Sequence, residues 1–461
     1  MNNKMRLIFL TDGYKYSHKS MYPAGTTKVV SNWTPRKQSY YHSYDTKTVH
    51  FGHVYLVYKL TEIFSNFINA TEEERTVGYE MYERLFPNSA IKVSDWEDLR
   101  ALGYLPIKIK ALDEGTAVNE NTPVLTIENT HPDFFWLTNY FETYLSQTLW
   151  LGSTNATYAR DLRHILEGFL EKTSDNPDGV IYQAHDFSAR GMAGHEASLI
   201  SGIAHLHYFK GSDTMSAVYL REVLYGDAPR GIVPATEHAV MCAGGKDNEM
   251  ETIERLLETY PTWVLSIVSD TWDYFGTLTN IYPALKEKIM ARDGKVVIRP
   301  DSGNPVDIIC GDLSAPYGSP QHKGSLQLLE ETFGVTINSK GYKVLDPHVG
   351  LIYGDGMNLA MIKQILTRMD LMKFSTENIV FGVGSYQYQY STRDNFSFVM
   401  KATYAEINGK HIQIFKQPKT DSGKNSHKGL TCVYPDLTWK DGFSEDQPED
   451  IRKVVLENVK G

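Results

Sequence analysis

The fold expected for this chain is decided by one stretch, Lys295-Val-Val-Ile-Arg299-Pro-Asp301-Ser302-Gly303-Asn304-Pro305. An apolar run typical of a buried strand is followed at once by a cation, a carboxylate and a glycine-containing turn. Parallel α/β proteins display functional groups in this way, at the carboxyl ends of their strands. Arg299 and Asp301 lie two residues apart, so they point to the same side if the strand geometry continues. The amides around Ser302 and Gly303 could cradle an anion. The carboxyl end of this strand therefore suits a substrate that carries phosphates, together with either a polar group that the protein orients or a metal ion that it binds.

The same design recurs along the second half of the chain. Apolar strand candidates end near Asp213, His238, Asp270, Asp301, Asp355 and Gly382, with helical stretches between several of them at 271–292, 321–333 and 357–372. Continuously apolar strands favour a parallel sheet covered on both faces. We therefore predict an α/β fold built on a parallel sheet or barrel, whose functional residues gather on the rim at the strand carboxyl ends.

The flanking segments have a different character. Residues 48–85 and 133–172 have helical spacing, and Thr71 with Glu74 predicts a capping box. Residues 105–127, and the tail beyond 390, predict short and antiparallel strands. The opening run up to Leu10 is predicted to be a first strand.

These patterns predict a domain organisation in three segments. They are a mixed α+β region at 1–174 with a helical part near 48–142, a region of alternating strands and helices at 175–389, and a strand-forming segment at 390–461.

Composition narrows the class of protein. The 461 residues carry a formal charge of −10, which argues against nucleic acid as the main partner, so any phosphate site must be a local basic pocket. The three cysteines are far apart and show no CxxC pairing, which argues against a zinc site or disulfide framework and favours a reducing cytosol. There is no apolar run of about 18 residues, so no membrane span is expected, and the apolar run at the start is too short for a signal peptide.

Three strand-end carboxylates come from separate βα units: Asp270, Asp301 and Asp355. On one rim they would hold Mg²⁺, grip ribose hydroxyls or stabilise positive charge in a transition state. The alternative for each is a helix N-cap, since aspartate is a favoured capping residue.

Other candidate residues each have a structural alternative. His238 could be an acid/base, a nucleophile or a phosphate ligand, although a lone histidine is more often structural. Phe187 could stack on a planar ring while Arg190 binds an oxyanion; the alternative is a core phenylalanine and a surface ion pair. Asp213 could accept a hydrogen bond from a ligand N–H, but it would repel a ligand carboxylate.

Several basic residues and one glycine-containing segment could bind phosphate groups. Arg36, Arg393, Lys401 and Lys416, with the basic loop 416–428, could serve a polyphosphate, or could form a solvated face. The Gly382-Val-Gly384-Ser385 segment could approach a phosphate closely, but it lacks the full dinucleotide fingerprint, and no Walker A sequence is present.

Taken together and in order, these motifs resemble the nicotinamide phosphoribosyltransferase family, a type II phosphoribosyltransferase group, almost from end to end. The matching segments are TDGYKYSH (11–18), MYP (21–23), HDFSARG (185–191), FKGSDT (209–214), VPATEH (233–238), SIVSD (266–270), IRPDSGNP (298–305), YGDGMN (353–358), FGVGS (381–385) and TRD (392–394). Ser385 stands where many family members carry a second glycine.

The resemblance implies an activity, a fold and an assembly. A phosphoribosyl group would pass from 5-phosphoribosyl 1-diphosphate (PRPP) to nicotinamide, giving nicotinamide mononucleotide and diphosphate in NAD salvage. The fold would be an irregular β/α barrel at 175–389 beside a mixed α+β domain, in which the segment 390–461 completes the N-terminal region. The protein would be a cytoplasmic homodimer with shared active sites. Mg²⁺ would assist, and ATP would couple to the reaction by phosphorylating His238, without being strictly required.

The resemblance also implies residue roles. Phe187 and the partner subunit's Tyr14 would sandwich the pyridine ring, with Asp12 near Tyr14, and Asp213 would accept the carboxamide N–H. Arg190 would contact the base or the 5′-phosphate region, and Arg299 would contact the carboxamide side and help order the site. Asp301, Gly354 and Asp355 would meet the ribose, Gly384, Ser385 and Arg393 the 5′-phosphate, and Arg36, Lys401 and Lys416 the diphosphate. Asp270 would hold His238. The direct metal ligands stay open.

Three other functions remain in competition. Nicotinate phosphoribosyltransferase shares the architecture, but Asp213 would repel nicotinate. A barrel hydrolase with a divalent metal lacks a multi-histidine ligand set. A phosphosugar-binding protein without activity would not need so many polar strand ends.

Overall fold

The computed structural model describes residues 3–227, 232–419 and 425–461. The chain divides into two compact units: unit 1 comprises Met1–Thr157 and Thr392–Gly461, and unit 2 comprises Tyr158–Ser391. The boundary at Thr157 falls inside the long helix α6 (Glu142–Thr173).

Unit 2 is built on a parallel sheet with the strand order β7-β6-β13-β12-β9-β8. The strands are β6 (Ala184–Asp186), β7 (Gly211–Ser212), β8 (Leu265–Val268), β9 (Val296–Arg299), β12 (Val349–Tyr353) and β13 (Ile379–Val383). All residues of β8 and β12 are buried, as expected for strands covered on both faces. The predicted α/β barrel class is confirmed, in the form of a curled half-barrel sheet.

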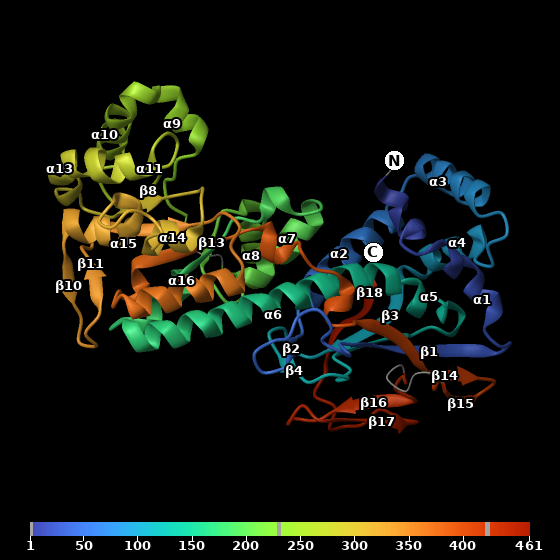
Figure 1. Cartoon of the computed structure of the whole chain (residues 1–461). Helices are drawn as coiled ribbons and strands as arrows, with labels where there is room; N and C mark the ends of the chain where they lie inside the picture. The colour runs from blue at the N-terminus through green and yellow to red at the C-terminus, as the bar shows by residue number, and fades with distance from the viewer. Residues whose placement is uncertain (1–2, 228–231, 420–424) are drawn as a thin grey trace. The chain divides into compact units, whose positions relative to one another are not determined.

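Helices connect the strands of this sheet. They are α7 (His195–His205), α8 (Met215–Tyr225), α9 (His238–Gly244), α10 (Glu249–Thr259), α14 (Pro305–Cys310), α15 (Pro320–Phe333) and α16 (Leu359–Leu371). The short helix α17 (Ser385–Tyr388) follows β13, the last of these strands along the chain. Helix α14 packs against both α15 and α16. β10 (Val335–Ile337) and β11 (Lys343–Leu345) form a separate antiparallel pair (Figure 1), and β11 contacts α15.

The stretch predicted to be helical at 271–292 is helical from Tyr274 to Met290 apart from a turn at Leu285, but it is not one uniform α-helix. The segment is broken into α11 (Tyr274–Gly276), a π-turn at Thr277–Ile281, α12 (Tyr282–Ala284) and α13 (Lys286–Met290). Pro283 lies in the first turn of α12, and proline there cannot supply the amide that a continuous helix needs. The expected strand near His238 is reduced to one bridge, Ala235 with Ser266.

Unit 1 contains an antiparallel sheet with the strand order β15-β14-β1-β5-β3-β18. Its strands are β1 (Thr26–Thr34), β3 (Tyr104–Ala111), β5 (Leu125–Asn129), β14 (Val399–Ile407), β15 (Lys410–Gln413) and β18 (Lys453–Lys460). C-terminal strands, red and orange in Figure 1, therefore lie beside blue and teal N-terminal ones. The antiparallel strands predicted beyond 390 are confirmed.

Helices of unit 1 include α1 (His18–Met21), α2 (His53–Ile68), α3 (Glu72–Leu85), α4 (Val93–Leu102) and α5 (Leu137–Tyr140). Thr71 and Glu74 form the predicted capping box. Short pairs complete the unit: β2 (Thr48–Val49) with β4 (Ala117–Val118), and β16 (Leu430–Val433) with β17 (Trp439–Phe443).

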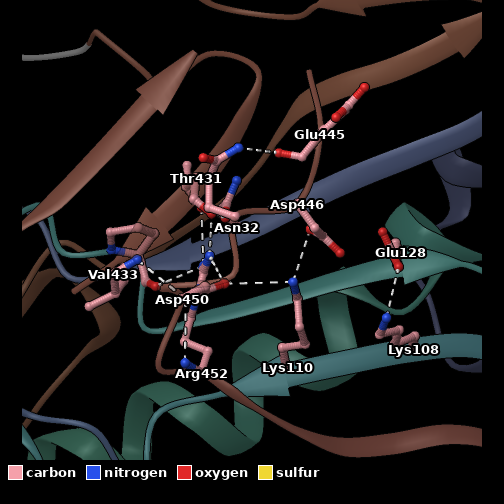
Figure 2. Close-up of polar contacts among 12 residues, drawn as sticks. Asn32, Lys108, Lys110, Glu128, Thr431, Val433, Glu445, Asp446, Asp450 and Arg452 are labelled. Carbon is pink, nitrogen blue, oxygen red and sulfur yellow. Dashed lines mark hydrogen bonds and ion pairs between the residues drawn. The ribbon is translucent and has the colours of Figure 1, made fainter. Parts of the chain in front are cut away.

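A buried ion pair ties the C-terminal segment into unit 1 (Figure 2). Arg452 lies 2.8 Å from Asp450 and donates to the Pro123 carbonyl at 3.1 Å. Lys110 of β3 reaches Asp450 at 3.6 Å. Burial alone would raise the pKa of Asp450, but Arg452 and Lys110 hold it below its usual range. Because these partners come from distant parts of the chain, they fix the C-terminal segment against the N-terminal strands.

The first strand predicted at the N-terminus is wrong. Asn3–Phe9 forms a 3₁₀ helix that packs against α2 and α3, with Leu7 and Ile8 fully buried. A short apolar run cannot distinguish a strand from a helical turn by periodicity. In the described ranges no helix is long and apolar enough to cross a membrane, and the cysteines Cys242, Cys310 and Cys432 are all free thiols.

Candidate active site

The carboxyl ends of the unit 2 strands surround a cavity of about 930 Å³. Nine residues predicted from the sequence line it: Phe187, Arg190, Asp213, Arg299, Asp301, Gly354, Asp355, Gly384 and Ser385. They follow five different strands of one parallel sheet, which is why residues up to 198 positions apart meet at one rim.

Phe187 is held by backbone on both sides. Its amide donates to the Val383 carbonyl at 2.9 Å. Its ring packs so closely on two glycines that an added Cβ would lie 2.3 Å from the ring at Gly382 and 3.1 Å from it at Gly354. The ring therefore lies over the ends of β12 and β13, half-buried beside the cavity, and can stack on a planar ligand.

Asp213 follows β7 and is paired with a histidine that the sequence did not single out as its partner. His185 Nε2 lies 3.0 Å from Asp213 Oδ1. The His185 ring is 5.0 Å from the Phe187 ring, centroid to centroid. No local sequence signal predicts this pair, because the two residues are brought together by the register of β6 with β7.

A buried carboxylate braces the same strand ends. Asp186 accepts hydrogen bonds from the Ser188 amide at 2.9 Å and from the Ser212 hydroxyl at 3.2 Å. Behind it, His205 of α7 contacts Tyr388 Oη at 2.7 Å and the Gly211 carbonyl at 3.0 Å. Burial lowers the pKa of His205 to about 4, although the nearby Asp186 opposes this shift.

Asp270 organises the turn after β9. Its Oδ2 accepts from the Asp301 amide at 3.0 Å and from the Ser302 hydroxyl at 2.6 Å, while Oδ1 lies 3.2 Å from His238 Nε2. The Asp270 side chain is 4% exposed and that of His238 is 46% exposed. The predicted pairing of Asp270 with His238 thus has the geometry of a histidine held at one nitrogen, with its ring open to solvent.

Charge is concentrated around Asp301. Burial raises the pKa of Asp301, and the neighbouring carboxylates Asp270 and Asp355 raise it further, while Arg299 and His238 oppose the shift. Arg299 Nε is buried and has no hydrogen-bond partner among the residues that the structure describes. A buried donor without a partner costs free energy, so this guanidinium is suited to a ligand acceptor.

At the end of β13, Gly384 precedes the short helix α17, and Ser385 is its first residue. A Cβ at Gly191 would lie 2.0 Å from Ser385 Oγ. The serine therefore fits because residue 191 is a glycine. Other cavity residues that the sequence did not single out as ligand contacts are Thr214, Thr236, Val240, Met357 and Tyr386.

The remaining predicted residues belong to unit 1. Tyr14 is 61% exposed, and Asp12 accepts a hydrogen bond from Thr143 at 2.7 Å. Arg393 is an exposed residue 3.4 Å from Asp394. Unit 1 also holds two of the predicted cations, Arg36 and Lys401, on a hollow of about 270 Å³.

The cations of unit 1 act on one another. Burial lowers the pKa of Lys401; Glu142 opposes this, and Arg36, Lys416 and Lys15 lower it further. Arg36 also donates to the Ser397 carbonyl at 3.4 Å, and the Lys416 amide donates to Ser426 Oγ at 2.8 Å. Such a cluster is stabilised by an anion. Of the predicted basic loop 416–428, residues 420–424 lie outside the described ranges.

The described residues contain no group of three or more His, Cys, Asp or Glu side chains placed to hold a metal ion. Mg²⁺ is commonly bound by one or two carboxylates together with substrate phosphates and water. Asp301 and Asp355, which is near enough to raise the pKa of Asp301, offer that kind of oxygen donor, so the rim fits a Mg²⁺ that arrives with a phosphorylated substrate.

Comparisons agree with this geometry. Residues 182–458 match the model of the "Nicotinate phosphoribosyltransferase (NAPRTase) family". The chain is 44% identical to a nicotinamide phosphoribosyltransferase of Acinetobacter baylyi, over 96% of this chain and 90% of that protein. It is 35% identical to a nicotinamide phosphoribosyltransferase of Mycoplasma pneumoniae, over 93% of this chain and 96% of that protein.

Solved structures share the fold at low sequence identity. Human nicotinic acid phosphoribosyltransferase aligns with a TM-score of 0.61 and 14% identity, covering 98% of this chain and 90% of the other. Nicotinate-nucleotide pyrophosphorylase from Pyrococcus furiosus aligns with a TM-score of 0.57 and 17% identity, covering 100% and 92%.

A half-barrel sheet with an aromatic ring, carboxylates and glycine turns on one rim, in a chain with these relatives, is a phosphoribosyltransferase of type II architecture. Within that class, the chain belongs to the nicotinate phosphoribosyltransferase (NAPRTase) family.

Proposed function

We propose that this enzyme transfers the phosphoribosyl group of PRPP to nicotinamide, forming nicotinamide mononucleotide and diphosphate. The observation that carries the choice of base is Asp213, a carboxylate on the cavity next to the stacking ring Phe187. A carboxylate accepts a hydrogen bond from a carboxamide N–H and repels a carboxylate ligand. The two relatives described above, both named for nicotinamide, support the same choice.

The reaction needs positioning more than proton transfer. The pyridine nitrogen uses its lone pair to bond to C1 of the ribose, while the C1–oxygen bond breaks and its electrons leave with diphosphate. Phe187 holds the ring plane and Asp213 the carboxamide, so the nitrogen faces C1. Asp301 and Asp355 orient the ribose hydroxyls and stabilise the positive charge that develops at C1. Mg²⁺ supplies charge neutralisation of the diphosphate when bound.

The two units have separate roles in this proposal. Arg190 and Arg299 border the base side of the cavity, and the turn at Gly384 and Ser385 receives the 5′-phosphate, helped by Arg393. Arg36, Lys401 and Lys416 receive the diphosphate. We propose a cytoplasmic homodimer in which the partner subunit's Tyr14 covers the second face of the pyridine ring; the exposure of Tyr14 and the free cysteines support this.

His238 is proposed to accept a phosphoryl group from ATP and so couple hydrolysis to tighter use of substrate. The histidine ring is exposed, and Asp270 accepts from its Nε2. A carboxylate in that position fixes the tautomer and stabilises the imidazolium that forms. The other ring nitrogen, Nδ1, is then the nucleophile.

The proposal is tested by measuring product formation from PRPP and Mg²⁺ with nicotinamide or nicotinate, with and without ATP. We expect nicotinamide mononucleotide from nicotinamide, and little product from nicotinate. In Asp213→Asn the amide side chain can donate as well as accept, so preference for nicotinamide should fall by about tenfold or more, the equivalent of one charge-assisted hydrogen bond.

Two outcomes would contradict the proposal. Preferential turnover of nicotinate by the unmodified enzyme would establish the second candidate, nicotinate phosphoribosyltransferase, which the family model and the shared fold favour. Absence of product from either base would exclude both transferase activities.

A further inference from the structure

The contact between His185 and Asp213 concerns a residue that the proposed mechanism does not use. His185 is the middle residue of β6, is 9% exposed, and is not among the described residues that line the cavity. Its Nε2 atom lies 3.0 Å from Asp213 Oδ1, whereas the Asp213 side chain is 49% exposed. His185 is thus buried in the protein, whereas the Asp213 side chain faces the cavity.

The imidazole is held in place by its packing. A Cβ on Gly211 would lie 2.6 Å from His185 Nδ1 and 3.2 Å from Cγ, so the ring lies directly over Gly211. Phe187 contacts the other side, with ring centroids 5.0 Å apart and the planes tilted by 50°. Because strand residue Gly211 pairs with His185 in the sheet, the direction of Nε2 follows from the backbone.

From this geometry we propose that His185 is a positioning residue that determines specificity for a pyridine carboxamide over a pyridine carboxylate. This inference rests on the proposed function of the cavity. His185 donates from Nε2 to Oδ1 of Asp213 and so occupies one carboxylate oxygen. Oδ2 is left as the acceptor for the carboxamide N–H, at an angle set by β6 and β7 rather than by a free side-chain rotation.

The experiment compares three variants of the full-length protein, with kinetics for each substrate and binding of nicotinamide measured by calorimetry without PRPP. His185→Phe keeps a planar ring over Gly211 but removes the donor. His185→Gln restores an N–H donor of similar reach. His348→Phe is the matched control, since His348 is paired with Asp346 at 2.7 Å at the amino end of β12, the opposite end of the strands from the cavity.

In His185→Phe we expect the KM and the dissociation constant for nicotinamide to rise by about tenfold, as for loss of one charge-assisted hydrogen bond. The ratio of kcat/KM for nicotinamide to that for nicotinate should fall by a similar factor, and the KM for PRPP should change by less than about twofold. His185→Gln should recover most of the loss, and His348→Phe should leave both substrates unchanged.

Equal increases in the KM of both substrates, or failure of His185→Gln to recover nicotinamide binding, would overturn the inference and leave His185 a packing residue. An unchanged base preference in His185→Phe would also overturn it. Failure of the proposed function is a separate result, because the unmodified enzyme would then form no nicotinamide mononucleotide.

Discussion

At the scale of single residues, Phe187 shows how glycines define a stacking surface. Its ring lies against Gly382 and Gly354, where side chains would occupy the same space. The glycines therefore matter because they have no side chain, which leaves room for the ring. The orientation of the ring follows from its packing on the backbone at the ends of β12 and β13.

Substituting these glycines tests that orientation. Gly382→Ala places a Cβ 2.3 Å from the Phe187 ring and 2.8 Å from the Gly354 Cα, so the ring must move. We expect the KM for nicotinamide to rise by roughly tenfold and stability to fall by about 1–3 kcal/mol, the usual cost of overpacking. Steady-state kinetics and urea unfolding measure the two effects.

The neighbouring position provides a graded comparison. At Gly354 the new Cβ would lie 3.1 Å from the ring, so Gly354→Ala should have a smaller effect of the same kind. Gly168→Ala is the control, because Gly168 is exposed in α6 with no atom within 4 Å of the added methyl group. It should raise stability by about 0.5–1 kcal/mol. Equal effects of all three substitutions would contradict the role assigned to close packing.

At the scale of elements, His205 connects three parts of unit 2. It lies on α7, contacts Tyr388 at the end of α17, and bonds to the Gly211 carbonyl in β7. A buried neutral histidine in this position links the turn of Gly384 and Ser385 to the strand that precedes Asp213. Protonation would place an added charge in the interior beside His185, which also lowers the pKa of His205.

The lowered pKa gives a pH dependence with a definite sign. The His205 pKa is about 4 in the folded protein, against 6.5 in the unfolded chain. Between these values the unfolded chain binds a proton that the folded state does not, so stability falls as the pH decreases from about 6.5 toward 4. The His205→Gln variant lacks this titrating group. Its unfolding free energy should therefore depend less steeply on pH in this range, and the difference in slope should correspond to at most one bound proton.

Denaturant unfolding at several pH values, compared between the two proteins, measures that slope. The comparison isolates His205 from His50 and His53, whose pKa values are also lowered by burial and which remain in both proteins. Identical slopes would show that His205 does not titrate in this range.

At the scale of the whole molecule, the distribution of charge is uneven. The chain carries a net charge of −10, yet unit 1 places Arg36 and Lys401 on one small hollow, with Lys416 near enough to lower the Lys401 pKa. A local cationic site in an acidic protein concentrates an anionic ligand where repulsion would otherwise keep it away.

Salt dependence tests that assignment. If the hollow receives the diphosphate, the KM for PRPP should rise with ionic strength, because the Debye length is only about 10 Å at 0.1 M salt. Lys401→Gln should raise that KM by roughly tenfold and weaken its salt dependence, while the KM for nicotinamide changes little. Lys59→Gln, a surface change in α2 at a residue 2.6 Å from Glu62, is the control and should behave as the unmodified enzyme.

The sequence by itself determined the rim. An apolar run followed by polar residues, as in Val296–Arg299 before Asp301, is a local pattern, and parallel strands bring all such ends to one edge. Asp213, Asp301 and Asp355 were predicted for this reason and line one cavity. The capping box at Thr71 was predictable because its partners are three residues apart.

Only the tertiary structure decided contacts between distant residues. The pair of His185 with Asp213 depends on the register of β6 with β7. The hydrogen bond from Arg452 to the Pro123 carbonyl joins two residues that are 329 positions apart in the sequence. The packing of Phe187 on Gly382 depends on the curl of a sheet. The short apolar run at Asn3–Phe9 became a 3₁₀ helix because α2 and α3 offered it a surface to bury against. Local propensity cannot determine such contacts, since their free energy comes from burial and from partners that the fold brings together.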